Sequence, residues 1–411
     1  MGNTQSPPVD HRFASASRAF APAELEELES MFDSLVSLSN ANQDSITLEV
    51  FQDHFGVKPP LGNRLYDLVT QERKDDRLTF EDLVISKSVY EKGTTEEIDE
   101  FIYRLVDVNG DGVVDKSDAE FAVLAIVETV FSSPNKTIVT SILKASVFNE
   151  EDNKNPSKSM TLDDFRCWVS FVPSLRKALG SLLLPSSPAR PGFLVPELKH
   201  QNEGSLMTKE YAWHIGGALS TSDKWVLLYH SSTSGLSFNT FFTCISSSGG
   251  PTVVVVKDKE GYLYGGYASH IWERHAEFYG DMKSFLFTLH PKASVYKATG
   301  ANRNFQWCGV NFSSESIPNG VGFGGKANHF GLFLGGSLDE GQTYSCTTYG
   351  SPSLSKSNVI VPEVIECWGL GTSRLEFGHE ALLKGTVLQR FQEDRHLLNI
   401  VGMADSSDSL S

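Results

Sequence analysis

The spacing of apolar residues divides this chain into a helical first part and a strand-rich second part. Up to residue 184, apolar residues recur at intervals of three and four, as in residues 23–38, 64–72 and 96–107, which gives each helix one apolar face. Beyond residue 205, short runs rich in β-branched and aromatic residues occur at 225–231, 251–258, 262–269, 284–290 and 365–371. Gly, Ser, Asn and Pro separate these runs, which predicts a mostly antiparallel β-sandwich with a few helices.

A repeated step of one apolar and one polar residue organises the helical part. The step occurs at Ile46-Thr47, Leu78-Thr79, Val114-Asp115 and Met160-Thr161, and a short acidic helix start that contains Phe follows each one. The steps lie 32, 36 and 46 residues apart, which suits four helix-loop-helix units arranged as two pairs. We therefore expect residues 21–184 to form one all-α domain.

The third loop, residues 107–118 with the sequence DVNGDGVVDKSD, has the composition of a calcium-binding EF-hand loop. Gly112 stands at position 6, where the loop must turn sharply. The predicted ligands at positions 1, 3, 5, 7, 9 and 12 are Asp107, Asn109, Asp111, the Val113 carbonyl, Asp115 and Asp118. The alternative is an acidic surface turn, which the helical patterns on both sides disfavour. Asp118 is shorter than the usual Glu, so we expect weaker Ca²⁺ binding and stronger competition from Mg²⁺.

The other three loops lack such a ligand set. The first offers Gln43-Asp44 and the second Asp75-Asp76, and neither has Gly at position 6. The fourth places Pro156 and Lys158 where a metal loop needs flexibility and no cation. We predict that these loops are structural and are held by short strand pairing.

Length and charge exclude several classes of protein. The chain of 411 residues suits two domains. Its net charge is −16, and residues 1–185 carry 31 of the 51 acidic but only 18 of the 35 basic residues, which argues against nucleic acid as a partner. No apolar run approaches the roughly 18 residues that span a bilayer. Five dispersed cysteines without a C-x-x-C pair favour reduced thiols in the cytoplasm.

The first residues, MGNTQS, match the N-myristoylation pattern, with Gly2 as the acceptor and Ser6 completing the motif. We expect residues 1–20 to be a disordered, lipid-carrying segment. One acyl chain binds a membrane weakly and reversibly, so a second membrane or protein contact is implied.

Two further segments flank the strand-rich domain, which we place at residues 205–371. Residues 185–204 contain four prolines and little periodicity, and we predict that they form a linker. Within residues 372–411, we predict an amphipathic helix over 379–401, which would either dock on its own domain or bind a partner. The predicted partner-binding residues are Leu382, Leu383, Val387, Phe391, Leu397 and Leu398.

Several motifs of the second part occur in the order of a known family. They include LMTKEYAWHI (206–215), KWVLLYHSSTSGLSFNTF (224–241), GPTVVVVKDKEGYLYGGYAS (250–269), WERHAEFYGDMKSFLFTL (272–289), GVGFGG…FGLFL (320–334), SCTTYGSP (345–352) and VIECWGLG (364–371). This part resembles the TLDc family over about 165 residues. Together with the calcium loop and the MGNTQS start, it is similar to the myristoylated TLDc proteins linked in animals to lysosomes and mTOR signalling.

The resemblance implies a two-sheet β-sandwich with helices, binding to the vacuolar proton-pumping ATPase (V-ATPase), and protection against oxidative stress. Some members of the family promote disassembly of the pump, and no accepted set of catalytic residues exists to carry over. We therefore expect a monomeric, non-enzymatic and calcium-responsive adaptor in the cytoplasm. We place it on the surface of the endolysosomal or vacuolar membrane.

The alternative is an enzyme that protects against oxidative stress. Its nucleophile would be a thiol of the TLDc-like part, at Cys244, Cys308 or Cys346, although no base is visible beside them. A hydrolytic site built from His329, His275 and Glu273 is a weaker hypothesis. A soluble calcium buffer is disfavoured because only one of the four loops keeps its ligands.

Overall fold

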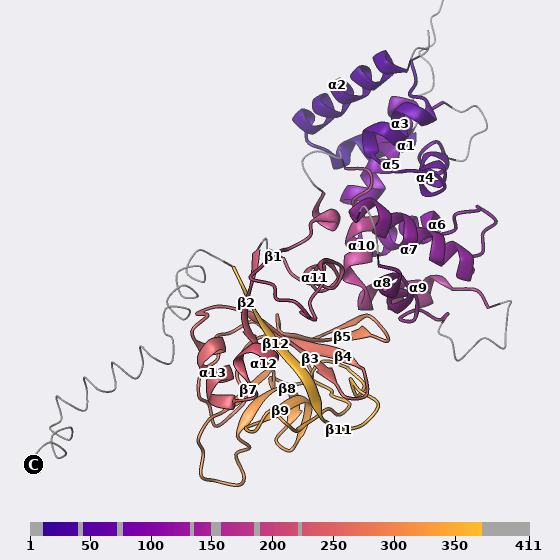
Figure 1. Cartoon of the computed structure of the whole chain (residues 1–411). Helices are drawn as coiled ribbons and strands as arrows, with labels where there is room; N and C mark the ends of the chain where they lie inside the picture. Colours follow the sequence, from indigo (N-terminus) through magenta and orange to yellow (C-terminus); the bar gives the residue numbers. More distant parts are fainter. Residues whose placement is uncertain are drawn as a thin grey trace, which may run out of the picture.

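The computed structural model describes residues 11–39, 44–71, 77–131, 135–148, 158–184, 190–220 and 224–371. Helices form one end of the described molecule and two β-sheets form the other (Figure 1). This confirms the predicted fold class, a helical N-terminal region followed by a two-sheet β-sandwich with helices. The predicted C-terminal helix lies outside the described residues.

The helical region consists of short helices joined by loops. They are α1 (His11–Ala16), η1 (Ser17–Ala19), α2 (Pro22–Leu38), α3 (Leu48–Phe55), α4 (Leu61–Val69), α5 (Phe80–Lys92), α6 (Thr95–Val106), α7 (Lys116–Val130), α8 (Lys136–Leu143), α9 (Leu162–Phe171) and α10 (Pro173–Leu179). The apolar faces of α2 to α10 meet in one core that includes Phe51, Leu65, Ile102 and Trp168.

The repeated apolar-polar steps pair the loops two by two. Ile46 forms a β-bridge with Leu78, and Val114 forms one with Met160; all four side chains are buried. The polar residue of each step accepts a hydrogen bond from the first turn of the next helix, as Thr47 does on α3, Thr79 on α5, Asp115 on α7 and Thr161 on α9. One local signal therefore ends a loop, starts a helix and supplies the strand pairing between units.

The prediction of disorder through residue 20 is wrong for residues 11–20. Helix α1 packs along α5, where Ala16 and Phe20 share a small cluster with Val84 and Ile85. Phe13 contacts the same cluster. Burial of these apolar groups outweighs the cost of ordering a segment with little helical periodicity of its own.

The second part forms two sheets that pack face to face. The first, in spatial order, contains β1 (Glu197–Lys199), β2 (Lys224–His230), β12 (Pro362–Leu370), β3 (Thr252–Asp258), β4 (Leu263–Ala268), β5 (Phe285–His290) and β6 (Ser294–Lys297). The second contains β11 (Val359–Ile360), β10 (Gly341–Gln342), β9 (His329–Gly335), β8 (Gly320–Lys326) and β7 (Gln306–Gly309). The pairs are antiparallel, except that β1 lies parallel to β2. Two short helices, α12 (Ser231–Ser234) and α13 (Phe238–Ser246), lie beside β12 and β2.

The glycine pair Gly265-Gly266 lies within strand β4 and forms neither a turn nor a phosphate cradle. A Cβ on Gly265 would lie 1.9 Å from the carbonyl oxygen of Val254 on the neighbouring strand. A Cβ on Gly266 would lie 2.8 Å from the ring of Phe323, which reaches across from the second sheet. Close approach of backbone and ring, which a side chain would prevent, therefore requires glycine here.

The segment predicted as a linker, residues 185–204, is structured over its described part. Helix η3 (Pro191–Phe193) packs on α10, with Gly192 against Ala178, and β1 joins the edge of the first sheet. Burial of Arg190 and Gly192 explains why a proline-rich stretch is fixed in place. The predicted linker is therefore ordered by contacts with both parts at η3 and β1.

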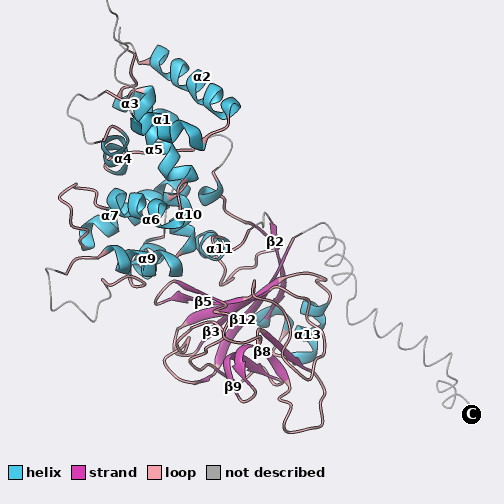
Figure 2. Cartoon of the chain, turned by 180° about the vertical axis from the view of Figure 1, so that it is seen from behind, coloured by secondary structure: helices cyan, strands magenta, loops and turns pink. Residues whose placement is uncertain are grey.

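Helix α11 (Lys209–Gly216) lies between the helical region and the sheets (Figure 2). Its Trp213 belongs to the helical core, whereas its Ile215 belongs to the apolar cluster on the outer face of the first sheet. At the other edge of that sheet, Phe171 of α9 contacts Tyr296 of β6, with ring centroids 5.6 Å apart. The two regions thus share two contact areas.

Candidate functional site

The predicted metal loop connects α6 to α7. Asp107 caps the end of α6, and Asp115 caps the start of α7. Between them, Gly110 and Gly112 adopt positive φ angles of 73° and 86°, which residues with a side chain rarely adopt. The loop therefore has the sharp turn at position 6 that its sequence predicts.

The loop carboxylates and the loop amide accept hydrogen bonds from their own backbone. Oδ1 of Asp107 accepts from the N–H of Gly110, and Oδ2 accepts from the N–H of Gly112, at 2.9 and 3.0 Å. Asn109 and Asp111 each accept from the N–H two residues onward, at 2.8 Å in both cases. These bonds fix the fold of the loop while leaving other lone pairs on the same oxygens.

The last two predicted ligands cap helix α7 reciprocally. Oδ1 of Asp115 accepts from the N–H of Asp118 at 3.0 Å, and Oδ2 of Asp118 accepts from the N–H of Asp115 at 3.1 Å. The first bond lowers the pKa of Asp115, whereas burial raises the pKa of Asp118, with the negative charges of Asp115 and Asp107 adding to it. A buried carboxyl close to two others is a position where a cation would relieve repulsion.

The chemistry of this donor set fits a hard divalent cation, since every predicted ligand offers oxygen. The described conformation does not bring the set to one point. In the part of the chain that the structure describes, no three His, Cys, Asp or Glu side chains lie together as metal ligands would. Ion binding would therefore require the predicted carboxylate ligands to move closer together than they are in this conformation.

An arginine contacts the first predicted ligand, Asp107, from a different pair of helix-loop-helix units. The first helix pair is the pair of units whose loops meet at Ile46 and Leu78, and the second is the pair whose loops meet at Val114 and Met160. The guanidinium of Arg64, on α4, has Nη2 at 3.4 Å from Oδ2 of Asp107, and both side chains are buried. Its Nε donates to the carbonyl oxygen of Arg104 at 3.1 Å. No sequence pattern links residues 64 and 107, so the sequence alone did not reveal this contact.

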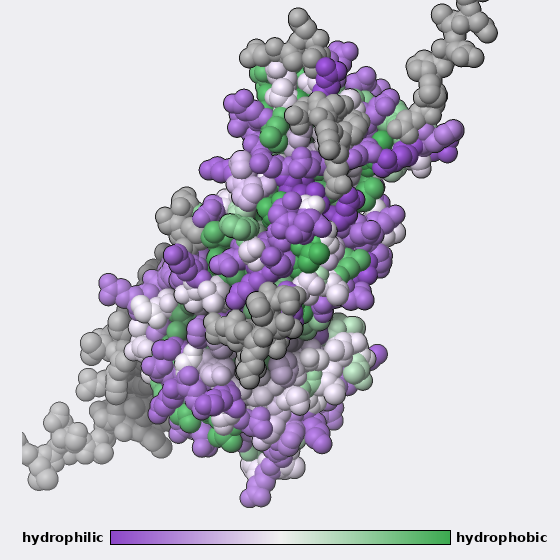
Figure 3. Space-filling model, turned by 90° about the vertical axis from the view of Figure 1, so that its right-hand side faces the viewer, coloured by the Kyte–Doolittle hydropathy of each residue, from purple (hydrophilic) through white to green (hydrophobic). Residues whose placement is uncertain are grey.

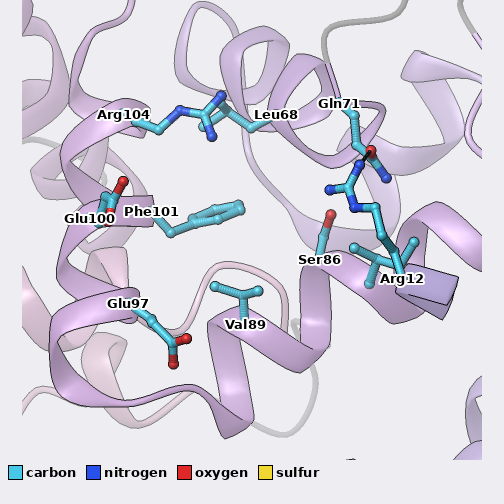
Figure 4. A pocket seen from close by; sticks show the side chains of 10 residues that line it. Arg12, Leu68, Gln71, Ser86, Val89, Glu97, Glu100, Phe101 and Arg104 are labelled. Atoms are coloured by element: carbon cyan, nitrogen blue, oxygen red, sulfur yellow. Dashed lines mark hydrogen bonds between the residues drawn. The ribbon is translucent and has the colours of Figure 1, made fainter. Parts of the chain in front are cut away.

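A pocket of about 460 Å³ opens beside α6 (Figure 4). Its lining residues come from α1, α4, the turn after α4, α5 and α6 and are Arg12, Leu68, Gln71, Ile85, Ser86, Val89, Glu97, Glu100, Phe101 and Arg104. Arg12 donates to the side-chain oxygen of Gln71 at one rim. Because α6 carries both the pocket wall and the start of the metal loop, the two sites share one rigid element.

The second part holds a fully buried carboxylate, Glu366 on β12. Its oxygens accept from the Ser205 hydroxyl at 2.8 Å, the Leu206 N–H at 2.5 Å, the Met207 N–H at 3.2 Å and the Trp368 indole N–H at 2.9 Å. This carboxylate therefore attaches the start of the domain to its interior strand. The only signal in the sequence is a charged residue within the apolar run 365–371, which alone names no partner.

The thiols proposed for the alternative enzyme are shielded to different degrees. Burial raises the pKa of Cys308 to about 12, so the reactive thiolate is disfavoured there. Cys346 is also buried, Cys244 is partly buried, and the exposed Cys167 lies in the helical region. The structure thus gives no support to a nucleophile at Cys308.

The histidines of the hydrolytic alternative have structural contacts. The ring of His275 stacks on Tyr279, with centroids 4.1 Å apart, and its Nε2 lies 3.8 Å from a carboxylate oxygen of Glu273. The ring of His329 stacks on Tyr344, also at 4.1 Å. Stacking at the surface accounts for both rings without a catalytic role.

The helices of the described residues fall short of the requirements for crossing a membrane. Within the described ranges, none of the helices combines the length and the hydrophobicity needed to cross a bilayer. The face seen in Figure 3 is largely hydrophilic, and its hydrophobic side chains form small separate areas. Gly2 and the six predicted partner-binding residues of 379–401 lie outside the described residues.

Comparison with known proteins identifies the sheet-containing part. Residues 200–371 match the family model described as "TLDc domain". This part of the chain is a TLDc domain. The match begins at the end of β1 and closes with β12, so it covers the strands of both sheets apart from β1.

The relatives extend the similarity to the helical region. The chain is 29% identical to "MTOR-associated protein MEAK7" of Homo sapiens over 462 residues, covering 100% of this chain and 98% of that protein. It is 33% identical to the Mus musculus protein of the same name over 256 residues, or 59% of this chain and 55% of that protein. "Oxidation resistance protein 1" of Rattus norvegicus is 33% identical over 144 residues, which are 35% of this chain and 16% of that protein. The helical region and the TLDc domain therefore occur together in similar proteins, whereas the oxidation-resistance protein is similar only over a shorter region.

Proposed function

We propose that this chain is a non-enzymatic, calcium-responsive adaptor that regulates a protein complex at the surface of the endolysosomal or vacuolar membrane. The observation that carries the proposal is the similarity over the whole chain to proteins named as mTOR-associated. The first partners to test are therefore the mTOR complex, from that name, and the V-ATPase, from the resemblance to the TLDc family. Affinity purification from cells, with calcium and with a chelator, should recover either complex in a calcium-dependent amount. If neither complex is recovered above the level of a tag-only control, the proposal is overturned.

The calcium part of the proposal rests on the loop at 107–118. Asp111 is exposed and contacts only its own loop among the hydrogen bonds described, so Asp111→Ala removes a predicted ligand without touching Arg64. Calorimetry should give one Ca²⁺ site per chain for the wild type, for which Mg²⁺ competes, and a large loss of Ca²⁺ affinity for the variant. Asp163→Ala is the matched control, since Asp163 is an exposed acidic residue on α9 outside the loop. Two or more strong sites, or unchanged binding in Asp111→Ala, would contradict a single site in this loop.

Membrane attachment is proposed to depend on Gly2. Replacing Gly2 with Ala removes the amine that myristoyl transfer uses after Met1 is cleaved. Because one acyl chain binds weakly, the wild type should distribute between soluble and membrane fractions, and the variant should shift to the soluble fraction. Identical fractionation of both proteins would remove lipidation from the proposal.

Partner binding is proposed to use the apolar face of residues 379–401. Phe391→Asp and Leu398→Asp each place a charge on that face, whereas Lys384→Asp changes a residue predicted for the polar face. The first two variants should reduce co-purification of pump subunits, and the third should leave it near the wild-type level. Deleting 379–411 should have the same effect as Phe391→Asp. If the deletion unfolds the TLDc domain, the segment docks on its own domain instead.

The competing enzyme hypothesis makes a separate prediction. If a TLDc thiol consumed peroxide, Cys244→Ser, Cys308→Ser or Cys346→Ser would abolish turnover by the purified protein. The raised pKa of the Cys308 thiol favours the non-enzymatic alternative, because a protonated thiol is a poor nucleophile. Peroxide consumption that one of these variants abolishes would establish the enzyme and refute the adaptor.

A further inference from the structure

Arg64 is placed where a bound cation would compete with it. The residue lies on α4, which belongs to the first helix pair, and its side chain is buried. Its guanidinium contacts the second pair at two points, the Arg104 carbonyl oxygen and the Asp107 carboxylate. A Cβ on Gly110 would lie 3.1 Å from Nη1 of Arg64, so the guanidinium also lies against the backbone of the metal loop.

The contact involves the first predicted ligand of the loop. Asp107 shares Oδ2 between the guanidinium and the N–H of Gly112. A divalent ion at the centre of the loop would need the same carboxylate and would stand close to the positive guanidinium. In the described conformation, Arg64 thus supplies part of the positive charge that an ion would supply.

Because Arg64 is buried, a change in its pairing affects the position of α4. A buried guanidinium is stable only while it is paired and hydrogen-bonded, because removing its partner leaves a charge without compensation. If an ion draws Asp107 inward, Arg64 loses part of its pairing and α4 must adjust. The neighbouring residues Leu61, Leu65 and Leu68 place α4 firmly in the helical core, so the adjustment reaches the first helix pair.

We propose that Arg64 is an internal competing cation that weakens calcium binding by the loop and couples ion binding to the first helix pair. This inference rests on the calcium binding proposed above and specifies how it is regulated. The coupling also reaches the pocket beside α6, because Leu68, one turn beyond Arg64, and Arg104 both line it. Ion binding would therefore change the walls of that pocket.

The size of the competition follows from Coulomb's law. A divalent ion and a guanidinium roughly 6 Å apart repel each other by enough to weaken binding about tenfold even at the dielectric constant of water. Partial burial strengthens the repulsion. Arg64→Gln should therefore bind Ca²⁺ at least about tenfold more tightly than the wild type. Arg64→Lys, which keeps the charge but not the planar fork, should bind with nearly wild-type affinity.

The test is calorimetric titration of the whole chain with CaCl₂. Lys92→Gln is the matched control, because it removes one positive charge from α5 at a pair with Glu24 outside the loop. The inference is supported if Arg64→Gln binds Ca²⁺ more tightly than the wild type and Lys92→Gln does not. Equal tightening by Lys92→Gln would show a general charge effect and overturn it, as would equal or weaker binding by Arg64→Gln. If the wild type binds and Arg64→Gln binds no better, the competition fails while the calcium site stands. If neither protein binds Ca²⁺, both ideas fail.

A second measurement uses only the wild type and does not depend on how the variants fold. Hydrogen–deuterium exchange with and without calcium should show a change in the amides of α4, at residues 61–69, as well as in the loop at 107–118. Protection confined to the loop, with α4 unchanged at a saturating calcium concentration, would overturn the coupling.

Discussion

Replacing Glu366 with Gln measures how strongly one buried carboxylate joins the start of the TLDc domain to strand β12. Gln keeps the shape of Glu but replaces one acceptor oxygen with an NH₂ donor. Oε1 of Glu366 accepts from Ser205 and Leu206, and Oε2 accepts from Met207 and Trp368. Whichever oxygen is replaced, at least one backbone or indole N–H loses its acceptor, because it then faces the NH₂ group of Gln, which is itself a donor.

The cost follows from these four bonds. One buried N–H without an acceptor destabilises the fold by about 1–3 kcal/mol. The bonds that remain change from charge-assisted to neutral, and each weakens by about 1 kcal/mol. We therefore expect Glu366→Gln to lower the free energy of unfolding by about 3–5 kcal/mol, a large share of the roughly 5–15 kcal/mol of a typical domain. The melting temperature should fall by about 6–20 °C.

Glu363→Gln is the matched control on the same strand. Glu363 pairs with Lys257 at 2.8 Å, but the two side chains are 48% and 39% exposed. Solvent-exposed pairs contribute about 0–1 kcal/mol, so this variant should unfold almost as the wild type does. Urea unfolding followed by tryptophan fluorescence compares the three proteins, and limited proteolysis around residues 200–207 reports the local effect. Equal stability of the Glu366 and Glu363 variants would refute the role assigned to the buried carboxylate.

Three further predictions concern other buried groups. Burial lowers the pKa of His214 from 6.5 to about 4, so between these values the unfolded chain binds a proton that the folded chain does not. Stability should therefore fall by about 2 kcal/mol between pH 7 and pH 5, and this loss should be absent from His214→Leu in unfolding titrations at both pH values. Gly217→Ala should destabilise the protein by about 1–3 kcal/mol in thermal unfolding, because its Cβ would lie 2.3 Å from the backbone of Ser174. The control Gly216→Ala should be nearly neutral, because its Cβ would come no closer than 3.3 Å to a neighbouring atom, on Pro196. In the native protein, iodoacetamide should modify the exposed Cys167 quickly and Cys308 only after unfolding; mass spectrometry that finds Cys308 modified as fast would contradict its burial.

Local patterns in the sequence predicted the elements and part of the candidate site. The apolar-polar steps at Ile46, Leu78, Val114 and Met160 predicted the paired loops, because one apolar residue in each step has to be buried against its counterpart. The runs rich in β-branched and aromatic residues predicted strands β2, β3, β4, β5 and β12. Residues 107–118 predicted a loop that turns sharply at Gly112, since a glycine there is a purely local requirement.

The sequence did not predict the order of two segments that distant partners fix in place. Residues 11–20 and 190–204 have weak periodicity and would be flexible in isolation. Contacts with α5 fix the first segment, and contacts of η3 with α10 and of β1 with β2 fix the second at residues 191–199. Such contacts depend on how separate elements pack, which the spacing of apolar residues within one segment does not encode.

The sequence by itself predicted the helical and strand-rich parts, several of their elements and a candidate calcium loop, because those features depend on neighbours a few positions apart. Only the tertiary structure decided which charges meet. Arg64 reaches Asp107 from another helix pair, and Glu366 reaches Ser205, Leu206 and Met207 from the far end of the TLDc domain. A buried charge is stable only when the fold brings its partner within hydrogen-bonding distance, and a linear sequence contains the residue types but not those distances.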